Sequence, residues 1–466
     1  MSGNVFIVLF TIDIVPMFKY FLSRDKALLK GKKFVFPGVN AADIVPVLSS
    51  YLTNCCPGIG KTMTNGFIKF VYGNRIFLRW VYKRQLKTIS LNTDPFPILV
   101  VADLNIGDAI NIQVACQTLK QLFPEREVHY AMNKKTYSLI DSNPDIDRTF
   151  PIFSGAAIPT DDDVERLKML MKASDYSLIF NFCPFFVTET FDGFKRRVLN
   201  HYPLTMGIAH DELKTQNVNH LRKKIFMYLT QLFPEETTKN QVILKDVSVF
   251  LGEDSLNLVQ DFLKSKGLYG KKGIVLFNPD STSPFTKFPL NKQVEMVQEL
   301  LKGGVQHLLI SSGFVFKGVE DEILNQICAS DAGKCIIVPK EFSLDSYAAL
   351  QDQCDVYITN DTGPLHLAAS RKNNKQANLL RNKTAIFSIF GATPARVYAY
   401  GSDNPLFFPA PQEAPSHVFI SNSRCRNITC INKLSKRCST VRCFDGLKPQ
   451  DMAEEILMYL KGNVWN

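Results

Sequence analysis

The residues best suited to chemistry lie where an apolar strand gives way to a helix, in the segment YITNDTGPLHLAA at 357–369. Asp361 or Thr362 can cap that helix, and Gly363 permits close approach of the backbone to a ligand. Free amides at such a helix start bind phosphate or sugar oxygens. A capped helix without a ligand would account for the acid and the proline of this motif, but not for His366 one turn further on. The segment therefore predicts a site for a nucleotide diphosphate.

A second loop, FNPDSTSPFTKFP at 277–289, also follows a predicted strand. The hydroxyls of Thr282 and Ser283 are hydrogen-bond donors, and Lys287 is a point cation. Donors and a cation suit a departing diphosphate, because negative charge grows on it as the sugar bond breaks. Loops rich in serine and threonine are commonly only turns. This loop therefore indicates a diphosphate site mainly through its pairing with the first motif.

A third segment, VADLNIGDAI at 101–110, carries a carboxylate at the start of a predicted helix. Asp108 at that place can accept a proton from an incoming hydroxyl and act as a general base. By position alone, an aspartate that only caps its helix is an equal alternative. The pairing with the two loops described above favours the catalytic interpretation.

Four cysteines near the C-terminus form a separate cluster within nineteen residues, with the spacing C-x4-C-x7-C-x4-C. They are Cys425, Cys430, Cys438 and Cys443. Clustered thiolates hold structural metals, but this spacing is looser than that of the usual zinc knuckle. Two disulfides and four unligated thiols are the alternatives.

From residue 97 onward, short apolar runs alternate with longer amphipathic segments, which is typical of βαβ units. The first series has expected strands at 98–102, 127–131, 150–153 and 177–182, and helices at 109–122 and 161–172. A polar segment at 211–245 is expected to be a hinge. The second series has expected strands at 273–278, 306–311, 335–339, 356–359 and 384–390, and helices at 290–302, 319–329, 343–351 and 363–371. A final helix at 449–460 is expected to cross back to the first domain. The pattern predicts an α/β protein with two doubly wound domains that face a central cleft.

The basic excess of the chain lies in its first fifth. The net charge is +10, and residues 1–93 hold thirteen Lys and Arg against three Asp. The balanced remainder argues against a nucleic-acid channel through the body of the protein. The stretch 61–87 mixes aromatic and basic residues without an acid, which is typical of a helix at an anionic membrane surface. A helix packed on the next domain is the alternative.

The length and the cysteine content limit the class of protein further. A chain of 466 residues allows two or three domains. The apolar run at 5–18 is interrupted by Asp13 and Pro16 and is shorter than the about 20 residues that span a bilayer. Seven of the eleven cysteines have apolar surroundings, which indicates a reducing compartment. We therefore expect a cytoplasmic protein.

Taken together, IGD at 106–108, the loop with Lys287 and NDTGPLHLAA at 360–369 resemble glycosyltransferase family 9, the heptosyltransferases of lipopolysaccharide core assembly. The resemblance covers about residues 97–461. It implies a GT-B fold and an inverting transfer from a nucleotide-activated sugar, typically ADP-heptose, to a hydroxyl of a lipid-linked glycan. It implies no obligatory catalytic metal. It also makes a structural zinc or iron plausible at the terminal cysteines.

The resemblance also assigns roles to domains and residues. The expected domains are an acceptor domain at 94–240, a donor-binding domain at 241–448 with the cysteine-rich tail, and a C-terminal helix at 449–466 that crosses back. The basic N-terminal region at 1–93 lies outside the resemblance. Asp108 is implied as the general base, and Thr282, Ser283 and Lys287 as ligands of the diphosphate. The implied contacts of the donor sugar and phosphates are Asp361, Thr362, Gly363 and His366.

The sequence leaves the donor base and the acceptor open. Where the family usually places a ribose-binding acid, this chain reads GFVFK at 313–317. The expected enzyme is peripheral at the inner face of the membrane and acts on a lipopolysaccharide-type glycan. The alternatives are a glycosyltransferase that acts on a protein or a capsule-type glycan, and a GT-B protein without catalysis that binds or scaffolds.

Overall fold

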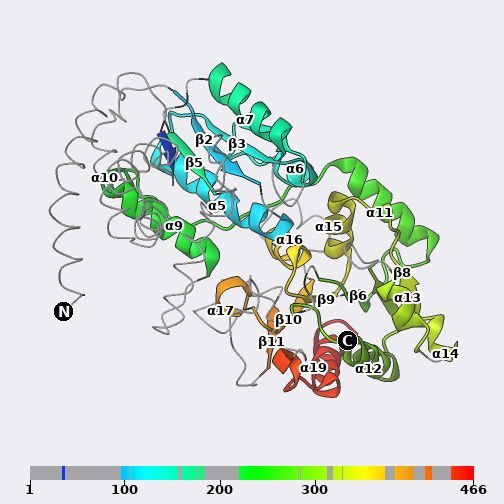
Figure 1. Cartoon of the computed structure of the whole chain (residues 1–466). Coiled ribbons are helices and arrows are strands. Elements are labelled where there is room, and N and C mark those ends of the chain that lie inside the picture. The colour runs from blue at the N-terminus through cyan, green and yellow to red at the C-terminus, as the bar shows by residue number, and fades with distance from the viewer. Residues whose placement is uncertain are drawn as a thin grey trace, which may run out of the picture.

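The computed structural model contains two lobes, each built on a parallel β-sheet (Figure 1). It describes residues 34–36, 96–103, 105–155, 160–174, 176, 178–182, 220–281, 283, 285–311, 318–327, 329–372, 384–393, 395–401, 415–421 and 442–465. We call the lobe of the first sheet, with its helices α5 to α10, the first lobe. The lobe of the second sheet, with its helices α11 to α19, is the second lobe. The expected GT-B architecture of two facing α/β halves is confirmed.

The first sheet has five strands in the order β1-β5-β2-β3-β4, all parallel. Their bounds are β1 Phe34–Phe36, β2 Ile98–Ala102, β3 Val128–Asn133, β4 Arg148–Phe153 and β5 Leu178–Asn181. The strands β2 and β3 are buried throughout, and β2 is a continuous apolar run, as expected of a strand covered on both faces. The strand β1 comes from the basic N-terminal region and pairs with β5, which the sequence did not predict.

Helices cover both faces of this sheet. On one face lies α5 (Ile106–Leu122), buried along almost its whole length. On the other face α7 (Asp161–Ala173) packs Leu167 against β2 and β4. The helix α7 begins with a capping box in which Thr160 and Asp163 bond to each other's backbone amides. The short η1 (Lys134–Thr136) and α6 (Tyr137–Ile140) join β3 to β4.

The prediction of a hinge at 211–245 is wrong for residues 220–240, whereas residues 241–245 do belong to the connection between the lobes. Two helices lie within residues 220–240, α9 (Leu221–Leu232) and α10 (Pro234–Lys239). The first packs Ile225, Leu229 and Leu232 into the core against α5. The chain then passes to the second lobe through residues 241–252, which form neither helix nor strand.

The second sheet has six parallel strands in the order β11-β10-β9-β6-β7-β8. Their bounds are β6 Ile274–Asn278, β7 His307–Ile310, β8 Cys335–Ile337, β9 Val356–Asn360, β10 Ala385–Phe390 and β11 Ser416–Ile420. The sequence predicted all of these except β11. The helices on one face are α11 Glu253–Ser265, α15 Leu344–Gln353, α16 Gly363–Arg371 and α17 Ala395–Tyr398. Those on the other are α12 Leu290–Lys302, α13 Val319–Leu324 and α19 Pro449–Asn463. The short α14 (Ala329–Ala332) and η3 (Arg442–Phe444) complete the described elements.

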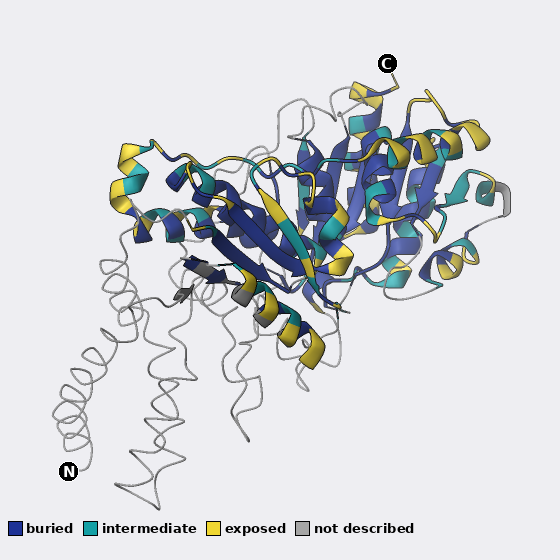
Figure 2. Ribbon diagram, turned by 90° about the horizontal axis from the view of Figure 1, so that it is seen from above, coloured by how far each residue is buried: buried dark blue, intermediate teal, exposed yellow. Residues whose placement is uncertain are grey.

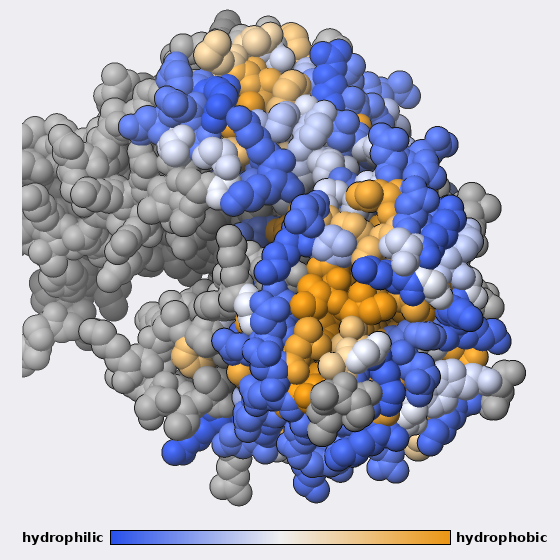
Figure 3. All heavy atoms as spheres, turned by 90° about the vertical axis from the view of Figure 1, so that its right-hand side faces the viewer, coloured by the Kyte–Doolittle hydropathy of each residue, from blue (hydrophilic) through white to orange (hydrophobic). Residues whose placement is uncertain are grey.

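One apolar cluster runs from the first lobe into the second. It includes Ile110 of α5, Ile225 of α9, Leu365 of α16 and Tyr357 of β9, all buried. Figure 2 shows most strands of both sheets dark and buried, with exposed residues on β4 and on the outer sides of the helices. On the side of the second lobe that lies at the right in Figure 1, apolar residues form a hollow between polar borders (Figure 3). Because the lobes share a core, they form one packed body.

The prediction that the last helix crosses back to the first domain is wrong. The helix α19 packs along α12 and places Met452, Ile456 and Leu460 in the core of the second lobe. Figure 1 shows α19 beside α12, at the end of the molecule away from the first sheet. The helix thus closes the outer face of its own sheet.

The predictions for residues 61–87 and for the rest of the basic N-terminal region, β1 excepted, concern residues outside the described ranges. In the part of the chain that is described, every helix is too short or too polar to cross a bilayer.

The packing of α19 predicts a large loss of stability from one substitution. Ile456 is fully buried, so Ile456→Ala should lower the free energy of unfolding by about 2–5 kcal/mol through lost burial and a residual cavity. Met458 on the same helix is 60% exposed, and Met458→Ala should change it by less than about 0.5 kcal/mol. Urea denaturation of both variants checks this, and equal effects would contradict the assigned packing.

Candidate functional site

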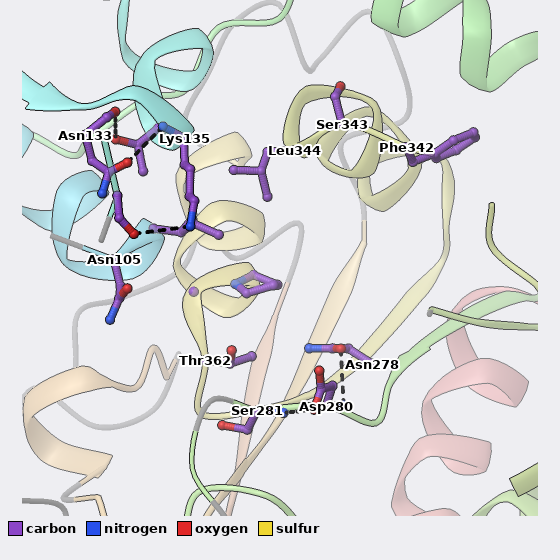
Figure 4. Close-up of a pocket in the computed structure, with 15 residues that line it drawn as sticks. Asn105, Asn133, Lys135, Asn278, Asp280, Ser281, Phe342, Ser343, Leu344 and Thr362 are labelled. Atoms are coloured by element: carbon purple, nitrogen blue, oxygen red, sulfur yellow. Dashed lines mark hydrogen bonds between the residues drawn. The ribbon is translucent and has the colours of Figure 1, made fainter. Parts of the chain in front are cut away.

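A cavity of about 550 Å³ lies between the two lobes, at the carboxyl ends of the strands of both sheets (Figure 4). Its first-lobe wall is formed by Asn105, Ile106, Asn133, Lys135, Thr136 and Gly155. Its second-lobe wall is formed by Asn278, Asp280, Ser281, Thr362, Gly363 and Pro364. Phe342, Ser343 and Leu344, at the start of α15, complete the lining. This is the place where open α/β sheets bind their ligands.

Two helix starts face each other at this cavity. The Cα atoms of Gly107 on α5 and Gly363 on α16 come so close that a Cβ on Gly363 would lie 2.8 Å from Ile106 Cβ and 3.2 Å from Gly107 N. Within the described chain, the capping residues Asn105 and Thr362 make no side-chain bond to their own helices. The first-turn amides of α5 and the Gly363 amide of α16 can therefore bind oxygens of a ligand between the lobes. In α16, Pro364 has no amide proton, and the Leu365 amide donates to the carbonyl of Thr362 at 3.0 Å.

A buried amide holds the loop after β6 against the turn after β9. The Asn360 side chain accepts a hydrogen bond from Phe288 N at 2.8 Å. It also donates to the carbonyls of Asn278 and Asp280, at 3.2 and 3.4 Å. Ser281 Oγ adds a bond to the carbonyl of Asp361 at 3.2 Å. The two second-lobe motifs found in the sequence thus form one folded unit, because one amide supplies both an acceptor and donors.

The structure places most of the predicted site residues on this unit. Ser283 and Lys287 are half-buried on the loop after β6, whereas Thr282 lies outside the described residues. Asp361, Thr362 and Gly363 form the turn into α16 and are also half-buried. The diphosphate role assigned to these residues stays a prediction.

Asp108 lies in the first turn of α5, two residues after Ile106, where the helix begins earlier than predicted. The charge of its carboxylate acts on Asp361 of the second lobe. Burial raises the pKa of Asp361 to about 6, the hydroxyl of Thr393 opposes this rise, and the carboxylate of Asp108 adds to it. The two acids, one from each lobe, are therefore within electrostatic reach of each other.

His366 does not line the cavity, in contrast to its predicted contact with the donor. Its ring is 5% exposed and packs beneath Gly107, with Nδ1 2.8 Å from the hydroxyl of Tyr400. Burial, together with the charge of Arg222, lowers the pKa of His366 to about 3, so the ring is neutral. The histidine contributes to the contact between the lobes.

A buried arginine forms the centre of that contact and was missed by the sequence analysis. Arg222 of α9 donates through Nε to Asn111 Oδ1 of α5, and through Nη2 to Ser370 Oγ of α16, both at 2.8 Å. Its guanidinium carbon lies 5.0 Å from the centre of the Tyr400 ring. Burial raises the pKa of Asp246 while the charge of Arg222 opposes the rise, so this acid is near the guanidinium. One side chain thus joins elements of both lobes.

The chain is similar to known proteins in part of its sequence and in its fold. The sequence profile of glycosyltransferase family 9 (heptosyltransferase) matches residues 233–375. The chain carries a glycosyltransferase family 9 domain. The resemblance drawn from the sequence is confirmed, and the protein is assigned as a glycosyltransferase. No curated protein sequence matches the chain significantly.

Solved structures of this class resemble the glycosyltransferase in fold. The family 9 glycosyl transferase from Veillonella parvula DSM 2008 is 17% identical with a TM-score of 0.55, and the match covers 79% of this chain and 98% of that one. The E. coli ADP-heptose lps heptosyltransferase II is 15% identical with a TM-score of 0.50, covering 78% and 99%. The iron-containing dodecameric glycosyltransferase TibC from enterotoxigenic E. coli is 10% identical with a TM-score of 0.44, covering 78% and 77%.

The predicted metal site of this glycosyltransferase involves Cys425, Cys430, Cys438 and Cys443, of which only Cys443 lies among the described residues. It is buried. Within the described ranges, no group of three or more His, Cys, Asp or Glu side chains could hold a metal. The structural zinc or iron stays a prediction.

The contact between the helix starts predicts a sharp effect of one methyl group. A Cβ on Gly107 would overlap the ring of His366, so Gly107→Ala should push the lobes apart and cost about 1–3 kcal/mol of unfolding free energy. Gly333→Ala is the control, because a Cβ there meets no atom within 4 Å. Thermal unfolding of both variants checks this. If Gly107→Ala were as stable as the control, the close contact of the lobes would be wrong.

The raised pKa of Asp361 predicts a pH-dependent gain in stability when the acid is removed. Its pKa is 3.8 in the unfolded chain and about 6 in the folded one, so ionisation costs folding free energy as the pH rises from about 4 past 6. Asp361→Asn should therefore stabilise the unliganded protein by about 1–3 kcal/mol at pH 8 and much less at pH 4.5. Asp254→Asn, at an exposed position of α11, should show no such difference. A gain equal at both pH values would contradict the raised pKa.

Proposed function

We propose that this glycosyltransferase moves a sugar, with inversion, from a nucleotide-diphosphate donor to a hydroxyl of a lipopolysaccharide-type or other lipid-linked glycan. The observation that carries the proposal is the meeting of two groups at one cleft. The Asp108 carboxylate of the first lobe does not line the cavity but lies close enough to raise the pKa of Asp361, and the start of α16 lines the cavity from the second lobe. A base on one side of the reacting carbon and an anion site on the other are what an inverting transfer needs.

In the proposed reaction, the first lobe activates the acceptor and the second lobe binds the leaving group. Asp108 takes the proton of the acceptor hydroxyl, and that oxygen attacks the anomeric carbon on the face opposite the diphosphate. The carbon–oxygen bond to the diphosphate breaks, and its electron pair leaves with the phosphate oxygen. The Gly363 amide at the start of α16 binds the departing group, and Lys287 with the loop hydroxyls balances its growing charge.

Asp361, Thr362 and Gly363 are proposed to contact the donor sugar and its phosphates. The second lobe offers these groups in a fixed arrangement, because Asn360 ties the loop after β6 to the turn they form. Preorganised donors need no rearrangement when charge develops, which is the main source of such stabilisation. His366 acts in this proposal only by holding the start of α5 in place.

ADP-heptose is the proposed donor. One of the similar structures is named for this donor, as the E. coli ADP-heptose heptosyltransferase. The segment at 313–317 that replaces the usual ribose-binding acid lies outside the described residues. The proposed location is cytoplasmic, peripheral at the inner face of the membrane, and rests on the basic composition of residues 1–93.

Removal of the proposed base should slow sugar transfer without weakening the binding of ADP. Asp108→Asn keeps the shape of the side chain but cannot take a proton, so transfer should fall by about 10²–10⁴-fold while the Kd for ADP stays within about twofold. Sugar transfer from ADP-heptose to a lipopolysaccharide core acceptor, with ADP binding by calorimetry, measures both. Glu125→Gln, at an exposed turn of the first lobe, is the control and should keep full activity.

Two results would contradict the proposal. If Asp108→Asn retained most of the transfer rate, another group would be the base. If the unsubstituted protein bound none of ADP, GDP and UDP in a thermal-shift titration, the donor assignment would fail.

A further inference from the structure

The helix that carries the proposed base also carries a buried amide one turn further along. Asp108 lies in the first turn of α5, and Asn111 follows it by three residues. The Asn111 side chain is fully buried, on the side of α5 that packs against α16 (Figure 1). Residues three apart are neighbours on one side of a helix, so a contact at Asn111 affects where the Asp108 carboxylate lies.

The Asn111 amide contacts both lobes. Its Oδ1 accepts a hydrogen bond at 2.8 Å from Nε of Arg222, which belongs to the first lobe. Its Nδ2 lies 3.5 Å from Nδ1 of His366, which belongs to α16 of the second lobe. The hydroxyl of Tyr400, also of the second lobe, lies 2.8 Å from His366 Nδ1 and 3.4 Å from Asn111 Oδ1. The helices α5, α9 and α16 therefore meet at one buried amide.

Arg222 sets the orientation of this amide. A guanidinium has donors only, so Asn111 must turn its oxygen to Arg222 and its NH2 group to His366. Burial and the charge of Arg222 lower the pKa of His366 to about 3, so the imidazole is neutral. Its Nδ1 can then accept a hydrogen bond while Nε2 carries the proton. The three side chains therefore fit together in one arrangement.

A second contact holds α5 on the other side of Asp108. A Cβ on Gly107 would lie 3.2 Å from His366 Nε2 and closer still to His366 Cδ2. The imidazole thus touches α5 through one edge directly before the proposed base, and through Nδ1 one turn after it. Contacts on both sides of Asp108 leave this part of α5 little freedom to rotate about its axis.

We propose that Asn111 is a positioning residue, which together with Arg222 fixes the rotation of α5 so that the Asp108 carboxylate lies beside the donor site. This inference rests on the proposed function and names the residue that positions its base. Asn111 does not line the cavity, so in this proposal it touches no substrate and acts only through Asp108. A misplacement of a reacting group by about 1 Å can lower a rate by about 10²-fold.

The test measures transfer from ADP-heptose to a lipopolysaccharide core acceptor, both saturating, together with ADP binding by calorimetry. Asn111→Leu keeps a similar volume but has neither acceptor nor donor, so kcat should fall by about 10–100-fold. The Kd for ADP should stay within about twofold, because the proposed ADP site belongs to the second lobe. Gln113→Met is the matched control. Gln113 is an equally buried amide of α5 that bonds to Asn143 within the first lobe, so kcat should change by less than about twofold.

Two double variants distinguish positioning from a loss of stability. In the Asp108→Asn background there is no base to position, so the addition of Asn111→Leu should lower kcat by less than about twofold further. The combination of Asn111→Leu with Arg222→Met leaves no unpaired buried charge, so it should fold even if the single variant does not. It should show the same loss of kcat, about 10–100-fold, with ADP binding retained.

Several results would overturn the role of Asn111. They are retention of most of kcat by Asn111→Leu or by its combination with Arg222→Met, an equal loss with and without Asp108, and an equal loss in Gln113→Met. A weakening of ADP binding as large as the loss of kcat would overturn it too. Retention of transfer by Asp108→Asn alone contradicts the proposed base instead, and it is recognised without any change at Asn111.

Discussion

The arrangement of the site depends on one buried cation. Arg222 leaves α9, bonds to Asn111 of α5 and to Ser370 of α16, and lies over the ring of Tyr400. A buried charge is stable only where its donors find acceptors, so these partners fix the two helices at one separation. That separation sets the distance between the starts of α5 and α16. The facing of Asp108 and Asp361 follows from it.

Around this contact, each lobe contributes a different kind of surface. The second lobe provides a rigid unit in which Asn360 ties two loops together, with the Gly363 amide at the start of α16. The first lobe provides the Asp108 carboxylate, which is the proposed base, and a polar cluster at the ends of its strands. In the proposed reaction, the leaving group is therefore bound by one lobe and the acceptor by the other.

The sequence was sufficient for most of the fold because parallel strands are continuous apolar runs and turn motifs mark their ends. It identified β2 to β10 and the second-lobe loops, and it placed Asp108 in the first turn of its helix. It failed where tertiary contacts decide the outcome. Arg222 lies in a segment as polar as a linker, and only the fold shows that its side chain is buried. The short strand β11 and the packing of α19 on α12 carry no local signal either.

The abutting backbones of Gly107 and Gly363 leave no room for one lobe to slide past the other. Any relative movement of the lobes would then be a rotation about the contact between Gly107 and Gly363. Asp108 directly follows Gly107, so a rotation about this contact would move its carboxylate little relative to the start of α16.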